Sequence, residues 1–260
     1  MTPIISGAAV SFDSYTPCVA IVTGASRGIG RAIVHRLADD GIDIAVNDIA
    51  TQQDGINKVV EEVREKGRRA IAIAGDVSVE ADVVAMVEKT AKELGSVDIM
   101  IANAGIFPTS KFIETSVEKF KKVMDTNILG VFLCFKYAAI QMMKQGCGGR
   151  LIAASSEAGK RGIPHLADYS ASKFAVRGLV QSASLELRTY GITVNAYTPG
   201  YIAHPSLLLT FKEDELKFRS SQNPAGKPED IASIVSYLIK PESYFVNGQS
   251  INVDGGNIFD

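Results

Sequence analysis

The chain has 260 residues, of which 46% are hydrophobic and 22% charged, and its formal net charge is −2. This composition is typical of a folded globular protein and excludes a collagen, a coiled coil and an extensively disordered chain. The balanced charge gives no electrostatic reason to expect binding to nucleic acid or to an anionic membrane. No stretch of about 18 apolar residues is present to span a bilayer, so we expect neither a nucleic-acid nor a membrane partner.

The cysteines and the N-terminal segment indicate where the protein works. Cys18, Cys134 and Cys147 form no Cys-x-x-Cys pair and no zinc spacing,. A sparse and odd number of cysteines is typical of a reducing compartment. Residues 1–17 contain no Lys or Arg and do not resemble a signal or transit peptide,. We interpret 1–17 as a leader before the first strand, and predict a cytoplasmic protein without a metal site.

Short apolar runs alternate with stretches of helical periodicity from residue 18 onwards. Strands are predicted at 19–22, 42–46, 70–73, 99–101, 150–154, 192–196 and 249–253. Between the strands, helices are predicted before Gly41, before Gly67, at 80–94, 117–144 and 168–190, and after 228–230.

Strands separated by helices need crossover connections, which make the sheet parallel, and near-continuous apolar strands indicate a sheet that is covered on both faces. The predicted fold is therefore α/β: residues 18–260 form a single Rossmann-like domain, a doubly wound parallel sheet of about seven strands with helices on both faces. The segment 200–227 has no clear strand or helix pattern, and we interpret it as a substrate lid.

A glycine-rich turn at 23–30, Thr-Gly-Ala-Ser-Arg-Gly-Ile-Gly, joins the first predicted strand to the first helix. Glycines let the backbone approach a pyrophosphate, and the helix N-terminus supplies N–H donors. The spacing differs from the common G-x-G-x-x-G, and it is the position between strand and helix that indicates a dinucleotide site. The predicted cofactor contacts in this turn are Gly24, Ser26, Arg27, Gly28, Ile29 and Gly30.

Asp48 follows the second predicted strand, where a carboxylate can accept hydrogen bonds from the adenosine ribose hydroxyls,. The same carboxylate repels a ribose 2′-phosphate, and neither Ile49 nor Ala50 offers a compensating cation. Arg27 favours NADP instead, because its guanidinium could bind such a phosphate. We predict NAD as the cofactor, with NADP as the less favoured choice.

Tyr169 and Lys173 lie four residues apart on one predicted helix and hence on one face,. A tyrosine with a pKa near 10 is a poor acid–base group at neutral pH. A neighbouring ammonium favours the phenolate and lowers that pKa, so the pair can serve as a general acid–base.

Together these motifs resemble the short-chain dehydrogenase/reductase family over nearly the whole chain. The matching pieces are the turn 23–30, Asp76-Val77, Asn103-Ala104-Gly105, Asn127, Ser155-Ser156, Tyr169 with Lys173, and Pro199-Gly200. Within the family, the segments 156–159, 169–179 and 254–259 resemble acetoin and butanediol dehydrogenases.

The resemblance implies a division of roles. Tyr169 would exchange a proton with the substrate oxygen, and Ser156, thirteen positions earlier, would hold that oxygen. Lys173 would bind the nicotinamide ribose and lower the pKa of Tyr169, and Asn127 would hold a water that leads to solvent. Further cofactor contacts would come from Asp76, Val77, Asn103, Ala104, Gly105, Pro199, Gly200 and Ile202, beside Tyr169 and Lys173.

The substrate end is less defined by motifs. His204 stands where the family usually has a threonine that holds the nicotinamide carboxamide. The candidate substrate contacts are Ser156, Glu157, Ile163, His165, Tyr169 and Tyr201.

The predicted function is that of an NAD(H)-dependent oxidoreductase that interconverts a secondary alcohol and a ketone. One alternative is an NADPH-dependent reductase of the 3-oxoacyl type, and another is a non-catalytic dinucleotide-binding sensor, which the intact Ser156, Tyr169 and Lys173 disfavour. The resemblance also implies a homotetramer that pairs through the helices 117–144 and 168–190.

Overall fold

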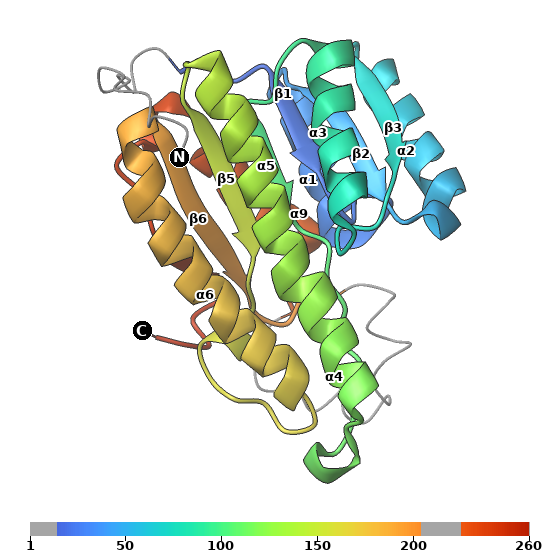
Figure 1. The fold of residues 1–260 in the computed structure, drawn as a ribbon, viewed down its shortest axis with the longest axis vertical. Helices are drawn as coiled ribbons and strands as arrows, with labels where there is room; N and C mark the ends of the chain where they lie inside the picture. Colours follow the sequence, from blue (N-terminus) through green and yellow to red (C-terminus); the bar gives the residue numbers. More distant parts are fainter. Residues whose placement is uncertain (1–14, 204–224, 260) are drawn as a thin grey trace.

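Seven parallel strands form one sheet in the order β3-β2-β1-β4-β5-β6-β7 (Figure 1). The computed structural model describes residues 15–203 and 225–259. The strands are β1 (Val19–Val22), β2 (Asp43–Asp48), β3 (Ala70–Ala74), β4 (Ile99–Ala102), β5 (Gly149–Ala154), β6 (Ile192–Pro199) and β7 (Ser250–Val253). The predicted seven-stranded parallel sheet is confirmed, and the predicted strand ends differ by a few residues at most.

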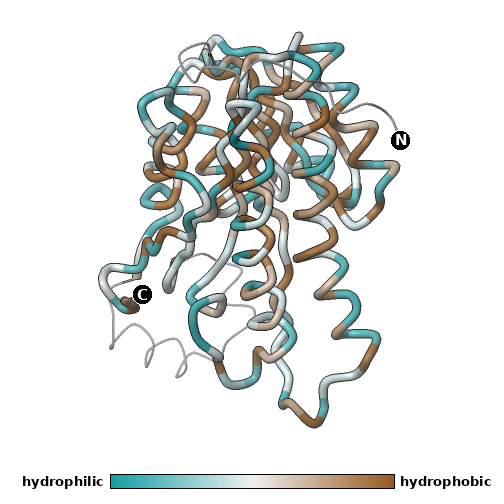
Figure 2. Tube along the Cα trace, turned by 60° about the vertical axis from the view of Figure 1, so that its left-hand side comes forward, coloured by the Kyte–Doolittle hydropathy of each residue, from teal (hydrophilic) through white to brown (hydrophobic). Residues whose placement is uncertain are grey.

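Helices cover both faces of the sheet, as predicted. They are α1 (Gly28–Asp39), α2 (Gln53–Glu65), α3 (Glu80–Leu94), α4 (Val117–Met124), α5 (Gly130–Gln145), α6 (Ala167–Leu187) and α9 (Pro228–Leu238). Val19 and Ile21 of β1 pack in one core cluster with α3, α5 and α6, whereas Ala20 and Val22 pack in a second with α1, α2 and α9. Successive side chains of a strand point to opposite faces, so each central strand supplies both cores. Figure 2 shows the hydrophobic segments gathered in the interior of this layered structure.

The helix predicted at 117–144 contains a π-helical turn, Asp125–Leu129, between α4 and α5. Apolar periodicity does not reveal such a turn, which inserts a residue and turns the following side chains. By length and composition Val117–Gln145 could cross a membrane, but 56% of its most apolar window is buried. Leu133 and Phe135 of α5 pack in the core, so contact with the sheet accounts for the apolar character of this helix.

Parts of the predicted leader and lid lie outside the described residues, namely 1–14 and 204–224. At the described end of the leader, Tyr15 is buried, and the guanidinium carbon of Arg150 lies 3.8 Å from its ring centroid. At the base of the lid, Ile202 and Gly226 form a parallel β-bridge. The two ends of the lid segment therefore lie side by side, next to the carboxyl end of β6.

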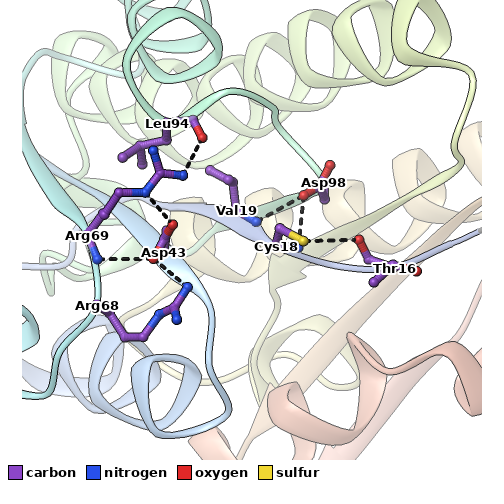
Figure 3. Close-up of polar contacts among 8 residues, drawn as sticks. All are labelled: Thr16, Cys18, Val19, Asp43, Arg68, Arg69, Leu94 and Asp98. Carbon is purple, nitrogen blue, oxygen red and sulfur yellow. Dashed lines mark hydrogen bonds and ion pairs between the residues drawn. The ribbon is translucent and has the colours of Figure 1, made fainter.

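Two buried carboxylates hold the amino-terminal edge of the sheet (Figure 3). Asp98 Oδ2 accepts hydrogen bonds from the backbone N–H groups of Cys18 and Val19, both at 2.9 Å, at the start of β1. Asp43, the first residue of β2, accepts from Arg69 Nε at 2.7 Å and lies 2.6 Å from Arg68 Nη2. These contacts tie β1 to β4 and β2 to β3 at the amino-terminal ends of the strands.

The Asp43 contacts lead to an expectation for stability. Burial alone would raise the pKa of Asp43, but hydrogen bonds from Arg69 and the charges of Arg68 and Arg69 hold this pKa below its ordinary value of 3.8. The stabilisation is therefore present above that value and is lost as the pH falls through the lower pKa of the folded state. We expect Asp43→Asn to lower the free energy of unfolding by about 1–2 kcal/mol at pH 7, because hydrogen bonds to charged groups are lost but both arginines remain partly solvated.

Urea unfolding followed from pH 3 to 7 measures this effect. The matched control is Asp39→Asn, which breaks an exposed ion pair with Lys66 and should change stability by less than about 0.5 kcal/mol,. An Asp43→Asn variant as stable as the wild type at pH 7 would contradict the assignment.

Candidate active site

A cavity of about 860 Å³ lies at the carboxyl ends of the strands and extends from the β1–α1 turn to the N-terminus of α6. Most of the residues predicted to contact cofactor or substrate line it: Gly24, Arg27, Gly28, Ile29, Gly30, Asp48, Asp76, Val77, Asn103, Ala104, Gly105, Ser156, Glu157, Ile163, Tyr169, Lys173, Pro199, Gly200, Tyr201 and Ile202. Ser26, Asn127 and His165 are not among the lining residues. The fold thus brings motifs from the whole chain to one edge of the sheet.

At Gly24 and Gly30 of the β1–α1 turn, a side chain would clash with the backbone. Gly24 has φ of 61°, and a Cβ added there would lie 2.9 Å from the Cα of Ala104. A Cβ at Gly30 would lie 2.3 Å from the carbonyl oxygen of Gly24. No side chain in the described part of the chain caps α1, so its first N–H groups are available to phosphate oxygens,. This geometry fits the pyrophosphate of a dinucleotide.

Asn103 braces that turn from the end of β4. Its Nδ2 donates to the carbonyl oxygens of Thr23 at 2.8 Å and Gly24 at 3.1 Å. Its Oδ1 accepts a hydrogen bond from the buried hydroxyl of Tyr197 at 2.8 Å. Asn103 therefore holds the carboxyl ends of β1, β4 and β6 in a fixed relation around the cavity.

Asp48 lines the nucleotide end of the cavity, and Ser26 holds it there. Asp48 Oδ2 accepts from Ser26 Oγ at 2.6 Å and from the Ser26 N–H at 3.2 Å, and Oδ1 accepts from the N–H of Ile49 at 2.9 Å. Ser26 is outside the cavity lining, and it contributes to the site by positioning the carboxylate of Asp48. Arg27 is exposed on the same turn and also lines this end.

Asp76, after β3, is held by its own loop. Its Oδ1 accepts from Ser78 Oγ at 2.6 Å and from the Ser78 N–H at 2.9 Å, and Lys122 Nζ lies 3.7 Å from Oδ2. Burial alone would raise the pKa of Asp76, but these hydrogen bonds and the Lys122 ammonium lower it. The carboxylate is therefore charged at neutral pH, with oxygens at the cavity wall.

Ser156 and Tyr169 meet in the middle of the cavity. Ser156 lies just after β5, where its Oγ accepts from the N–H of Ala158 at 3.2 Å, and it lines the cavity together with Tyr169. Burial raises the pKa of Tyr169, the nearby Ser156 hydroxyl lowers it, and the charge of Glu157 raises it, with a net shift upward. The sequence predicted the opposite direction; in the protein without cofactor, burial outweighs the effect expected from Lys173.

Lys173 is buried beneath Tyr169. Its Nζ donates to the carbonyl oxygen of Ala154 at 2.8 Å and lies 5.5 Å from the centroid of the Tyr169 ring. Burial lowers the pKa of Lys173 to about 8, so the ammonium form still predominates at neutral pH. The predicted face shared by the two side chains is confirmed.

Asn127 lies in the π-helical turn and connects two walls of the cavity. Its Nδ2 donates to the carbonyl oxygen of Ile106 at 2.9 Å and to Ser172 Oγ at 3.1 Å, and its Oδ1 accepts from the Ile106 N–H at 2.9 Å. Ser172 Oγ donates in turn to the carbonyl oxygen of Tyr169 at 2.7 Å. Asn127 therefore braces the loop after β4 against α6, while its role in holding a water remains a prediction.

A second brace, which sequence reasoning missed, joins α4 to the residue before Tyr169. Asp168 is buried, its Oδ1 accepts from the Tyr169 N–H at 2.8 Å, and Lys119 Nζ lies 3.8 Å from its Oδ2. Lys119 Nζ also donates to Ser110 Oγ, and the Ser110 N–H donates to the carbonyl oxygen of His165 at 3.0 Å. The sequence shows an Asp directly before the tyrosine, and this residue could have been singled out. Its partner Lys119 lies 49 positions earlier in the chain and could not be found from the sequence.

The substrate end has mainly apolar and aromatic walls. Besides the predicted Ile163 and Tyr201, it includes Phe107, Pro108 and Leu166, and the Phe107 and Tyr169 ring centroids are 5.9 Å apart. His165 lies at the surface with φ of 66°, outside the lining. His204 lies outside the described residues. Within the described ranges, no cluster of three or more His, Cys, Asp or Glu side chains could hold a metal ion.

Comparisons with known proteins agree with this architecture and show the family. The family model for short chain dehydrogenases matches residues 18–215, so the chain belongs to the short-chain dehydrogenase/reductase family. It is 47% identical over 245 residues to the short-chain dehydrogenase/reductase eriH of Hericium erinaceus, covering 92% of this chain and 97% of that one. It is 40% identical over 241 residues to a 3-oxoacyl-[acyl-carrier-protein] reductase FabG of Staphylococcus aureus, covering 91% and 96%.

Solved structures show the same fold. A short-chain type dehydrogenase/reductase from Mycobacterium marinum superposes with a TM-score of 0.85 at 31% identity, covering 96% of this chain and 98% of that one. The chain is thus an oxidoreductase of this family, whose members bind NAD or NADP and act on small molecules,. The likeness to acetoin and butanediol dehydrogenases remains a prediction.

The burial of Lys173 leads to an expectation for stability without cofactor. Between about pH 8 and the ordinary value of 10.5, the unfolded lysine keeps a proton that the folded lysine has lost, so stability rises with pH across this range,. We expect Lys173→Met to be more stable than the wild type at pH 7 by about 1–3 kcal/mol, because a buried charge is removed while one hydrogen bond is lost.

Urea unfolding of the cofactor-free protein from pH 7 to 10.5 measures this difference. The control is Lys58→Met, an exposed lysine on α2, which should leave both the stability and its pH slope unchanged. A destabilised Lys173→Met variant would contradict the expectation.

Proposed function

We propose that the protein is a cytoplasmic NAD(H)-dependent oxidoreductase that interconverts a secondary alcohol and a ketone. The observation that carries this proposal is that Ser156, Tyr169 and the buried Lys173 line one cavity, between a glycine-rich turn that suits a dinucleotide and a mainly apolar substrate end. A bound nicotinamide cofactor supplies the hydride chemistry.

The residues supply position and acid–base chemistry. Ser156 Oγ accepts from a backbone N–H, which leaves its own proton to donate to the substrate oxygen,. Tyr169 gives a proton to that oxygen in reduction and takes one in oxidation. The Lys173 ammonium favours the phenolate of Tyr169 and can donate to a ribose hydroxyl.

Tyr169→Phe tests the acid–base role. We expect kcat to fall at least about 100-fold, because general acid–base catalysis contributes two or more orders of magnitude. The Kd for NAD, measured by titration calorimetry, should change less than about threefold, since only a hydroxyl is removed. Tyr237→Phe removes a hydroxyl from an exposed residue of α9 and serves as the control. A Tyr169→Phe variant that keeps a tenth of the wild-type kcat would show that another group moves the proton.

The choice of NAD is supported by Asp48, whose oxygens Ser26 and the Ile49 N–H hold at the nucleotide end. We expect Asp48→Ser to shift the ratio of kcat/KM for NADP over NAD upward by at least about tenfold, or about 1.4 kcal/mol, because the repulsion of a 2′-phosphate is removed and Arg27 remains. Asp54→Ser, on the exposed face of α2, is the control.

A second candidate is an NADPH-dependent reductase of 3-oxoacyl thioesters. It is favoured by Arg27 at the nucleotide end of the cavity and by the name of the Staphylococcus aureus relative. A wild-type protein that prefers NADPH and reduces acetoacetyl thioesters faster than simple ketones would favour this candidate over the first.

We also propose a homotetramer that pairs through α4, α5 and α6. Val131 and Phe135 of α5 are buried, whereas Phe132 and Ile140 are 44% and 41% exposed. Phe174 of α6 is also 44% exposed, which leaves an apolar outer stripe that a second copy would cover,. We expect a tetramer by light scattering at micromolar concentration, and Phe132→Glu should shift the mass to a smaller species. A wild-type monomer at that concentration would refute the proposal.

A further inference from the structure

Glu157 is the single acid at the substrate end of the cavity among the described lining residues. The cavity lining at this end also includes Phe107, Pro108, Ile163, Leu166 and Tyr201. The other two acids of the lining lie at the nucleotide end, where Asp48 ends β2 and Asp76 follows β3. A carboxylate in an otherwise apolar chamber needs a physical explanation, because burial of an unpaired charge is unfavourable.

Two donors hold the Glu157 carboxylate, and both bind the same oxygen. Asn257 Nδ2 donates to Oε2 at 2.9 Å, and Arg161 Nη2 donates to Oε2 at 3.1 Å. Asn257 belongs to the segment after β7, where Asp254 Oδ2 accepts from the Ile258 N–H at 2.8 Å. Two distant segments therefore fix the position of this side chain.

The other oxygen, Oε1, receives no hydrogen bond from the described residues, although only 12% of the side chain is exposed. Ionised carboxylate oxygens only accept hydrogen bonds, and each has room for two. An acceptor with free capacity on a side chain that lines the cavity matches a donor on the ligand,.

The charge of Glu157 also acts on the reacting centre. It follows Ser156 directly in sequence, and it raises the pKa of Tyr169, after the larger effect of burial. Arg161, whose side chain is 54% exposed, compensates part of this charge from the solvent side. A neutral hydroxyl is therefore a sufficient partner for Oε1, whereas an anionic group would meet like charge.

We propose that Glu157, positioned by Asn257 and Arg161, selects substrates that carry a hydroxyl group close to the reacting carbonyl and disfavours anionic ketones. The proposal rests on the proposed alcohol–ketone chemistry and specifies the substrate class. A ketone that carries hydrogen in place of the hydroxyl leaves the charged Oε1 without a hydrogen-bond donor. This cost accounts for discrimination between two ketones that are otherwise equal.

Paired substrates test the hydroxyl preference. We expect the wild-type kcat/KM for 2-hydroxycyclohexanone to exceed that for cyclohexanone by at least about tenfold. In Glu157→Met, which keeps the length of the side chain without the acceptor, the ratio should fall to about one. The ratio is informative even if overall activity falls. Glu61→Met removes an exposed carboxylate from α2 and should keep the wild-type ratio.

A second variant separates charge from shape and remains useful if Glu157→Met does not fold. Glu157→Gln keeps the shape and removes the charge. We expect it to raise the kcat/KM for 4-oxocyclohexanecarboxylate relative to its methyl ester by about fivefold or more over the wild-type ratio. A wild-type hydroxyl preference below twofold, or a preference that survives in Glu157→Met, would overturn the inference. Absence of turnover for every ketone with both cofactors would instead overturn the proposed function, and the inference with it.

Discussion

The buried ammonium of Lys173 is the constraint on which the active-site end of the molecule depends. It lies beneath Tyr169 with the Ala154 carbonyl oxygen as its protein partner, and burial moves its pKa to about 8. A charge in such a place opposes folding, so the surrounding backbone has to be held by other interactions. Asn127, in its π-helical turn, supplies them by joining the loop after β4 to α6. The π-helical turn thus places Asn127 where it can make these bonds,.

At the nucleotide end too, other residues hold the groups that are expected to contact a ligand. Ser26 hydrogen-bonds Asp48, and Asn103 ties the glycine turn to β4 and β6. Groups that are already oriented lose less conformational freedom when a ligand binds. Rigid strand ends and glycine turns therefore set cofactor binding, whereas the substrate end is built from loop segments whose side chains can differ without disturbing them.

The sequence predicted the parallel sheet because apolar runs and helical spacing are local patterns, and it predicted the shared face of Tyr169 and Lys173 because four residues make about one helical turn. It did not predict the π-helical turn, since the segment around it is apolar enough for a single inserted residue to escape notice in the helical pattern. It also gave the wrong direction for the pKa of Tyr169 in the cofactor-free protein, because burial depends on the tertiary environment. The ion pair of Lys119 with Asp168 was not predictable either, because its partners come from separate helices.

Two contacts show how substrate choice can be separated from catalysis in this chain. Ser156 and Glu157 are consecutive, yet Ser156 faces Tyr169, while Glu157 is fixed by Asn257 from the far end of the sequence. The end of β5 thus places Ser156, α6 places Tyr169, and the segment after β7 positions the carboxylate of Glu157. Because no residue of this segment is in the described cavity lining, changes in it would act on the substrate end through the position of Glu157. The same fold can therefore carry one chemistry with different substrates, which is the physical reason that family membership alone does not identify the substrate.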